Sequence, residues 1–237
     1  MGKVLTLARR ELAGLFFSPQ AYVEGAAFLF CSSLWFFLAI FQPGQEATLR
    51  PLFEGMAYIL IPVAPLLTMR LMSDEYRSGT VETLMTAPVT ETQVILGKFL
   101  GVAVFYLVFL ATTAALLVLM IFYGQPDTGV VLMGYLGMVL LGLAFLAVGL
   151  FSSTVTRHQA LAFVVGALIL LVFTVGMQWL AFHAPLLSNL ATKLSAVNYF
   201  REFARGVFDT RGVIFFVSLT VAFLLFSVKS LESRRWK

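Results

Sequence analysis

Long apolar runs dominate the chain and set its predicted fold. Six of them are long enough to cross a bilayer, because about 20 apolar residues of helix span its hydrocarbon core. They are predicted at residues 22–41, 55–72, 94–123, 130–151, 160–182 and 213–229. The pattern therefore predicts an all-α membrane protein with six transmembrane helices, forming a single domain over residues 1–237.

Residues 1–19 precede the first span and alternate at helical period. The apolar stripe consists of Leu5, Ala8, Leu12, Leu15 and Phe16. The charged residues predicted to lie away from it are Lys3, Arg9, Arg10 and Glu11. Basic residues opposite an apolar stripe are typical of a helix lying in the membrane interface. The segment 1–19 is thus predicted to be an interfacial amphipathic helix.

Residues 183–212 separate the last two spans and are too polar to cross the membrane. Leu187, Leu190, Leu194, Val197 and Phe200 recur at helical spacing. A second stripe consists of Phe200, Phe203, Ala204 and Val207. Such stripes predict short amphipathic or re-entrant helices on the outer face.

A polar interruption, residues 73–92, lies between the second and third spans. Ser78-Gly79-Thr80 is predicted to end one helix, and the Thr80 hydroxyl can cap the next. Val81, Leu84 and Met85 share one face of that next helix, which Pro88 stops. Thr90 and Gln93 then form a predicted capping box. The short helix is predicted to lie on the membrane surface and offer its polar face to a soluble partner.

Small residues and prolines predict how the spans pack. Small residues four apart allow close approach of membrane helices. They occur as Gly97-x-x-x-Gly101, Ala111-x-x-x-Ala115 and Ala162-x-x-x-Gly166, and as Gly134, Gly137, Gly142 and Gly149 in the fourth span. Pro62 and Pro65 predict a kink in the second span.

The charge distribution predicts the orientation in the membrane. Only 12% of the residues are charged, against about 25% in soluble domains. With both termini cytoplasmic, eleven of the 16 lysines and arginines lie inside and five outside, which agrees with the positive-inside rule. The net charge of +4 is therefore explained by lysines and arginines on the cytoplasmic side, and it does not indicate nucleic acid binding. No cleavable signal peptide is expected, because the first apolar run starts too late and is too long.

The chain offers little catalytic chemistry. It has no P-loop, since Gly97-Lys98-Phe99 lacks the preceding glycine and the hydroxyl. His158 and His183 lie at opposite ends of the fifth span, and the lone Cys31 is expected to be a buried apolar residue. Hence no catalytic, metal or cofactor-binding residue is expected, and the chain is not predicted to be an enzyme. Glu24, near the start of the first span, is expected to be interfacial.

One motif carries a family resemblance. Glu75-x-x-x-Gly79-Thr80-Val81-Glu82-Thr83-Leu84-x-Thr86-x-Pro88, with Gly97-Lys98-Phe99, resembles the cytoplasmic loop of ABC-2 type transporter permeases. The gliding-motility-type permease is the nearest type, and the nitrous-oxide-reductase maturation permease is a related one. In that family a coupling helix in this loop docks on a separate ATPase subunit. The resemblance assigns this role to Glu75, Arg77, Thr80, Glu82, Thr83, Leu84, Met85 and Thr86.

The resemblance also implies partners and location. These are a cytoplasmic ABC ATPase that carries ATP and magnesium, a second permease chain (identical or related), membrane lipid, and an accessory periplasmic or membrane protein. The location is the inner membrane of a bacterial or archaeal cell, with both termini cytoplasmic. The expected function is to couple ATP hydrolysis to export or to a conformational change across the membrane.

Other interpretations remain open at the level of sequence. The chain could be a force-transmitting or scaffold subunit without transport, or a stand-alone channel or carrier. The nearly complete absence of ionisable residues from the span centres argues against an ion-coupled carrier. Within the loop, Glu75 and Glu82 could instead pair with Arg77 or Lys98, and exposed pairs of this kind contribute only ~0–1 kcal/mol.

Overall fold

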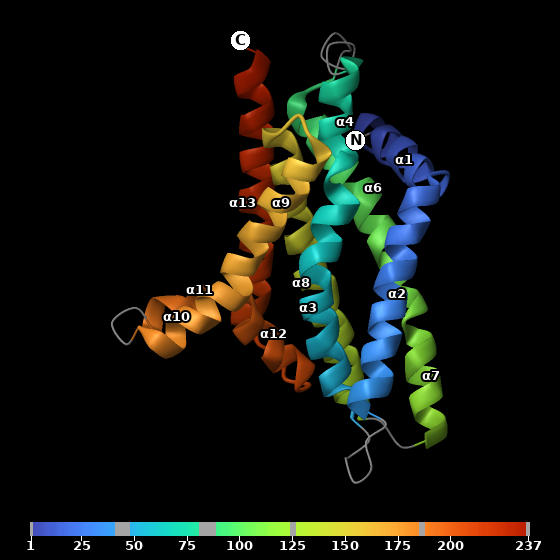
Figure 1. Cartoon of the computed structure of the whole chain (residues 1–237), viewed down its shortest axis with the longest axis vertical. Coiled ribbons are helices and arrows are strands. Elements are labelled where there is room, and N and C mark those ends of the chain that lie inside the picture. The colour runs from blue at the N-terminus through green and yellow to red at the C-terminus, as the bar shows by residue number, and fades with distance from the viewer. Residues whose placement is uncertain (1, 41–47, 81–88, 124–126, 185–187, 236–237) are drawn as a thin grey trace.

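The computed structural model describes residues 2–40, 48–80, 89–123, 127–184 and 188–235, and every regular element in these ranges is a helix (Figure 1). The first elements are α1 (Gly2–Phe16), α2 (Pro19–Ile40), α3 (Arg50–Thr68), α4 (Arg70–Ser78), α6 (Glu91–Thr112) and α7 (Ala114–Tyr123). They are followed by α8 (Thr128–Val155), α9 (Gln159–Leu171), the π-helical turn η1 (Val172–Gly176), α10 (Met177–His183), α11 (Ser188–Leu194), α12 (Ala196–Ala204) and α13 (Thr210–Arg235). The predicted all-α fold class is confirmed.

Six stretches of the described chain are long and apolar enough to cross a membrane. They are Pro19–Ala39, Arg50–Ser78, Glu91–Phe122, Thr128–Val155, Gln159–His183 and Thr210–Ser233. Each overlaps one predicted span, so the chain is a multi-pass membrane protein. The second stretch is longer than predicted, because α4 carries it on through the beginning of the polar interruption.

Both ends of the chain lie at one end of the bundle, together with the last turn of α4 and the first turn of α6 (Figure 1). We call this the loop end. An even number of spans brings the termini to the same side, as the sequence predicted.

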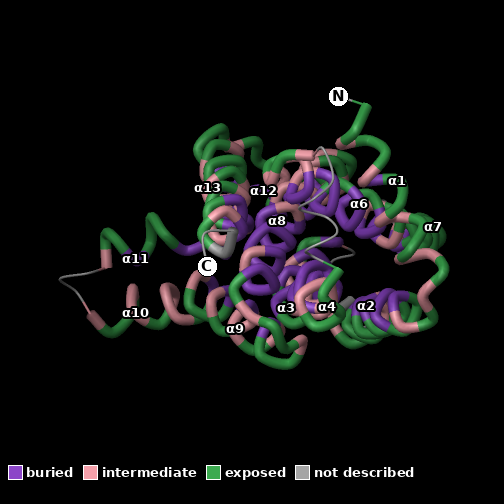
Figure 2. The backbone as a smooth tube through the Cα atoms, turned by 90° about the horizontal axis from the view of Figure 1, so that it is seen from above, coloured by how far each residue is buried: buried purple, intermediate pink, exposed green. Residues whose placement is uncertain are grey.

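Helix α8 lies at the centre of the bundle and is buried along most of its length (Figure 2). The predicted glycine face is confirmed, because each glycine leaves room for a side chain of a neighbouring helix. The pairs are Gly134 with Phe53, Gly137 with Phe203, Gly142 with Tyr106 and Gly149 with Thr68. Glycine at these positions lets α3, α6 and α12 approach α8 closely.

The second span is interrupted, but after the prolines and not at them. Helix α3 runs through Pro62 and Pro65, and ends at Thr68. Met69 separates it from α4, with its amide donating to the Pro65 carbonyl at 2.8 Å. The interruption therefore falls at Met69, four residues after Pro65, and the kink expected at the prolines stays a prediction.

A serine from α8 bridges this interruption. The Ser153 hydroxyl donates to the Met69 carbonyl at 3.0 Å and accepts from the amides of Met72 at 3.0 Å and Ser73 at 3.2 Å. A side chain inserted into the helical hydrogen-bond ladder is a known cause of kinks. The fully buried Ser153 thus ties the start of α4 to the central helix.

Helix α1 confirms the predicted amphipathic helix but packs differently from the predicted stripe. Its partner is α6, where a Cβ added at Gly97 would lie 2.6 Å from Leu7 and one at Gly101 would lie 2.8 Å from Glu11. Helix α1 therefore packs against the predicted face of small residues on the third span. Leu5, predicted in the stripe, is 70% exposed and lies outside this contact.

The segment before the last span contains the short helices α11 and α12. In α12 the predicted residues Phe200, Phe203 and Ala204 are buried against the bundle. Val207 is exposed, against the prediction, because the helix ends at Ala204 and Gly206 turns the chain with φ 84°.

Helix α11 and the preceding α10 project from the side of the bundle (Figure 1). Leu190 and Leu194, predicted as part of an apolar stripe, are correspondingly exposed. Cys31, expected to be buried, is exposed on the surface of this chain. Ala111 and Ala115 are exposed as well, so the close helix contact predicted for them is not made within this chain and stays a prediction. Lipid tails are as apolar as a leucine side chain, so apolar composition does not separate the lipid face from the core.

Candidate coupling site at the loop end

The polar interruption begins with a defined helix end. Helix α4 stops at Ser78, and Gly79 follows in the left-handed region with φ 74°, the usual geometry of a glycine after a helix. The Ser78 hydroxyl donates to the Asp74 carbonyl at 2.7 Å and lies 2.9 Å from the hydroxyl of Thr80. The predicted break at Ser78-Gly79-Thr80 is confirmed.

The far side of the interruption is equally well defined. Thr90 accepts from the Gln93 amide, and Gln93 accepts from the Thr90 amide, both at 3.3 Å. This reciprocal capping box is the predicted one, and it starts α6 at Glu91. The segment between Thr80 and Val89 is thus anchored by two ordered helix ends.

Five of the predicted docking residues lie outside the described residues: Glu82, Thr83, Leu84, Met85 and Thr86. Arg77 and Thr80 are exposed at the end of α4, where a soluble partner has access to them. Glu75 differs from these two, because its side chain is only 23% exposed and turns inward.

Lys98 is the partner of Glu75. Its ammonium group lies 2.8 Å from a Glu75 carboxylate oxygen and 3.1 Å from one of Glu11, while its own side chain is 7% exposed. The pairing of Glu75 with Lys98 is therefore present, but as a largely buried ion pair and not an exposed one. The electrostatic attraction within such a pair is strong, because water screens buried charges less than exposed ones.

The second carboxylate belongs to α1. Glu11 was predicted to lie away from the apolar stripe, and instead it points toward α6 across the Gly101 contact. Lys98 consequently joins three helices: α1 through Glu11, α4 through Glu75, and its own α6. We call these three residues the Lys98 cluster.

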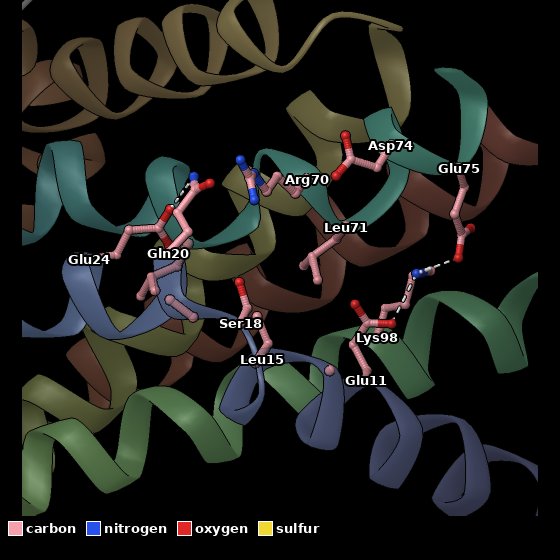
Figure 3. Close-up of a pocket in the computed structure, with 13 residues that line it drawn as sticks. Glu11, Leu15, Ser18, Gln20, Glu24, Arg70, Leu71, Asp74, Glu75 and Lys98 are labelled. Atoms are coloured by element: carbon pink, nitrogen blue, oxygen red, sulfur yellow. Dashed lines mark hydrogen bonds and ion pairs between the residues drawn. The ribbon is translucent and has the colours of Figure 1, made fainter. Parts of the chain in front are cut away.

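A cavity of about 250 Å³ lies beside the Lys98 cluster, at the junction of α1 and α2 (Figure 3). Its ionisable lining residues are Glu11, Glu24, Arg70, Asp74, Glu75 and Lys98. Gln20 donates to Glu24 at 2.8 Å, and Gln159 of α9 donates to Asp74. Glu24 is only 5% exposed, so its side chain is buried within the chain, and its expected place near the membrane interface stays a prediction.

The chemistry of this region is electrostatic. Among the described residues no group of three or more histidine, cysteine, aspartate or glutamate side chains is placed to hold a metal ion. Sequence reasoning missed Glu11, Arg70 and Ser153 as members of the site. Glu11 and Arg70 carried a detectable signal, because a charge within or beside an apolar membrane helix requires a partner.

Comparisons with known proteins identify the family of this chain. A family model described as ABC-2 family transporter protein matches residues 16–207. Over 105 residues the chain is 30% identical to the probable multidrug ABC transporter permease YbhS of Escherichia coli, in strain K12 and in O157:H7. That alignment covers 44% of this chain and 27% of the relative's length. Since the family model spans most of the chain, from the last residue of α1 to just past α12, the chain belongs to the ABC-2 family of transporter proteins.

Proposed function

We propose that this chain is the membrane-spanning permease subunit of an ABC transporter. A separate ATPase would bind the segment between α4 and α6, and its closure on ATP would move that segment. The observation that carries the proposal is the Lys98 cluster, which links both helices flanking the segment to each other and to α1. Family membership and the relationship to YbhS support the same function.

The proposed mechanism is mechanical. A displacement of the segment acts first on α4, whose exposed end carries Arg77 and Thr80. Helix α4 is attached at its start to α8 by Ser153 and along its length to α6 by the Glu75–Lys98 pair. Motion of α4 therefore reaches the central helix and the third span together. ATP and magnesium would reside on the partner subunit, in keeping with the lack of a P-loop in this chain.

The working unit is proposed to contain two permease chains and two ATPase chains. Six spans, one of them the central helix α8, form a single bundle, so a path across the membrane would form between two such bundles. The inner membrane, with both termini cytoplasmic, is the proposed location, because the positive-inside rule puts the loop end there.

The decisive experiment is co-purification with the ATP-binding protein encoded beside this chain, with ATP hydrolysis measured in nanodiscs. The test variant is Glu82→Ala/Thr83→Ala/Leu84→Ala in the proposed docking segment. The matched control is Leu190→Ala/Thr192→Ala/Lys193→Ala in α11, which is also exposed but remote from the loop end.

The proposal expects the intact chain and the control to retain the ATPase, and the test variant to release it while still eluting as a folded protein. If the intact chain retains no ATPase, or if both variants retain it equally, the docking segment has been wrongly assigned.

A further inference from the structure

The cavity at the junction of α1 and α2 has a feature that ATPase coupling does not use. Arg70 lines it, and the guanidinium forms no hydrogen bond or ion pair with any described residue. Its Nε is buried and has no partner among them. A buried guanidinium nitrogen without a partner is costly unless a further group satisfies it.

The neighbouring carboxylates do not satisfy Arg70. Figure 3 shows Arg70 between the Gln20–Glu24 pair on one side and Asp74 on the other. Glu24 is held by Gln20 and Asp74 by Gln159, so each acid is oriented by a neutral amide instead of by the guanidinium. The cavity therefore presents a guanidinium that makes no hydrogen bond or ion pair with a described residue, flanked by two anchored carboxylates, of which Glu24 lies near enough to interact with its charge.

This arrangement suits a ligand with both charges. A phosphate accepts two parallel hydrogen bonds from a guanidinium, which is the preferred geometry of arginine. A primary ammonium group has three donors, which carboxylates accept. We propose that this cavity binds a phosphoethanolamine group, with its phosphate on Arg70 and its ammonium on the neighbouring Glu24 carboxylate.

The position of the cavity indicates that the group arrives on a phospholipid of the leaflet at the loop end. Glu24 lies five residues into α2, about 8 Å from its first residue at ~1.5 Å per residue. This is close to the depth of the headgroup layer, which is roughly 5–8 Å thick on each side.

The charge balance argues for this headgroup over others. The six ionisable residues of the lining include four acids and two bases, so a purely anionic headgroup would meet net repulsion. A choline headgroup carries the positive charge but has no N–H to donate. A phosphatidylethanolamine headgroup has both the charge and the donors.

The test is lipid binding by the full chain alone, without the ATPase. Delipidated protein in detergent is titrated with phosphatidylethanolamine, phosphatidylcholine and phosphatidylglycerol, and each bound state is resolved by native mass spectrometry. We expect phosphatidylethanolamine to bind most tightly, and Arg70→Gln to weaken it at least about tenfold. Glu24→Gln should reduce the preference for ethanolamine over choline while leaving phosphate binding in place.

Control variants distinguish binding in this cavity from a general attraction of the lipid to positive charge. Arg157→Gln removes an exposed arginine outside the cavity and should leave binding unchanged. Arg70→Lys keeps the charge but loses the two-pronged geometry, and it serves as the second variant if Arg70→Gln fails to fold. Soluble phosphoethanolamine, titrated separately, identifies the source: binding as tight as that of the lipid would keep the headgroup chemistry but assign it to a soluble ligand.

Two results would overturn the inference. One is equal binding of the three phospholipids by the wild-type chain. The other is unchanged phosphatidylethanolamine binding by both Arg70 variants. Neither result depends on the ATPase, so the coupling proposal and the lipid site fail or stand separately.

Discussion

Replacing Lys98 with methionine tests whether the Lys98 cluster holds the loop end together. Methionine keeps the length and the apolar stem of the side chain but removes the positive charge. Glu11 and Glu75 would then face each other without the ammonium group that lies 3.1 Å and 2.8 Å from their oxygens. Because the Lys98 side chain is only 7% exposed, water has little access to this position and would solvate the two carboxylates poorly once the ammonium group is gone.

The expected cost follows from the burial of the three side chains. Removing one partner of a fully buried ion pair costs about 3–5 kcal/mol, and exposed pairs contribute about 0–1 kcal/mol. The two carboxylates are 25% and 23% exposed, which places this cluster between the limits at roughly 2–3 kcal/mol. For a chain of this length, about 2–4 °C of melting temperature corresponds to each kcal/mol, so Lys98→Met should melt roughly 4–12 °C lower.

A neutral triple variant isolates the electrostatic cause. Lys98→Met with Glu11→Gln and Glu75→Gln removes every charge together, and neutral replacement of a buried ionic group is often tolerated. It should therefore melt above Lys98→Met alone. The matched control is Lys229→Met, which breaks an exposed pair with Glu232 at 2.7 Å and should change the melting temperature little.

Tryptophan fluorescence in detergent, at one fixed scan rate, measures all four proteins. A Lys98→Met melting temperature within about 2 °C of wild type would refute the reasoning. A triple variant no more stable than the single one would refute the electrostatic part of it.

Three further predictions concern the same end of the molecule. Ser153→Ala should lower the free energy of unfolding by about 1–2 kcal/mol, because it removes the bridge to Met69, Met72 and Ser73. The melting temperature should fall measurably. The control Ser218→Ala, on the exposed side of α13, should leave the melting temperature unchanged. Gly101→Val should displace α1, since a Cβ added at this position would lie only 2.8 Å from the Glu11 side chain. Faster proteolysis within α1 would show this, and Gly14→Ala, with nothing within 4 Å, should not cause it. Thr90→Ala should cost about 1 kcal/mol through loss of the capping box, seen as faster hydrogen exchange in the first turn of α6; unchanged exchange would contradict the assigned cap.

Local signals made much of the fold predictable. The lengths of the apolar runs alone predict six spans, because crossing a bilayer requires a minimum length of apolar helix. The break at Gly79 and the cap at Thr90 were equally predictable, since each depends on residues within one turn of the helix end. These features need no knowledge of the rest of the chain.

The contacts between distant residues were not predictable in this way. Ser153 reaches α4 across about 80 positions of sequence, and Lys98 reaches Glu11 across 87. Helical period identified α1 as amphipathic, but the groove at Gly97 and Gly101 decides which side docks, and that side includes Glu11 and excludes Leu5. Which polar residues meet at the loop end is therefore a property of the packed bundle.

The two attachments of α4 differ in kind, and the difference predicts how the loop end moves. Ser153 binds backbone groups in a fully buried position at Met69, where opening would leave several polar groups unpaired. The Glu75–Lys98 pair lies further along α4, where the Glu75 side chain is 23% exposed, and its opening leaves Lys98 paired with Glu11. A pull on the end of α4 should accordingly break the ion pair first and rotate α4 about Met69. Because Arg70 and Asp74 lie on the same moving helix, this rotation would change the cavity, and an occupant of the cavity would in turn favour one position of α4.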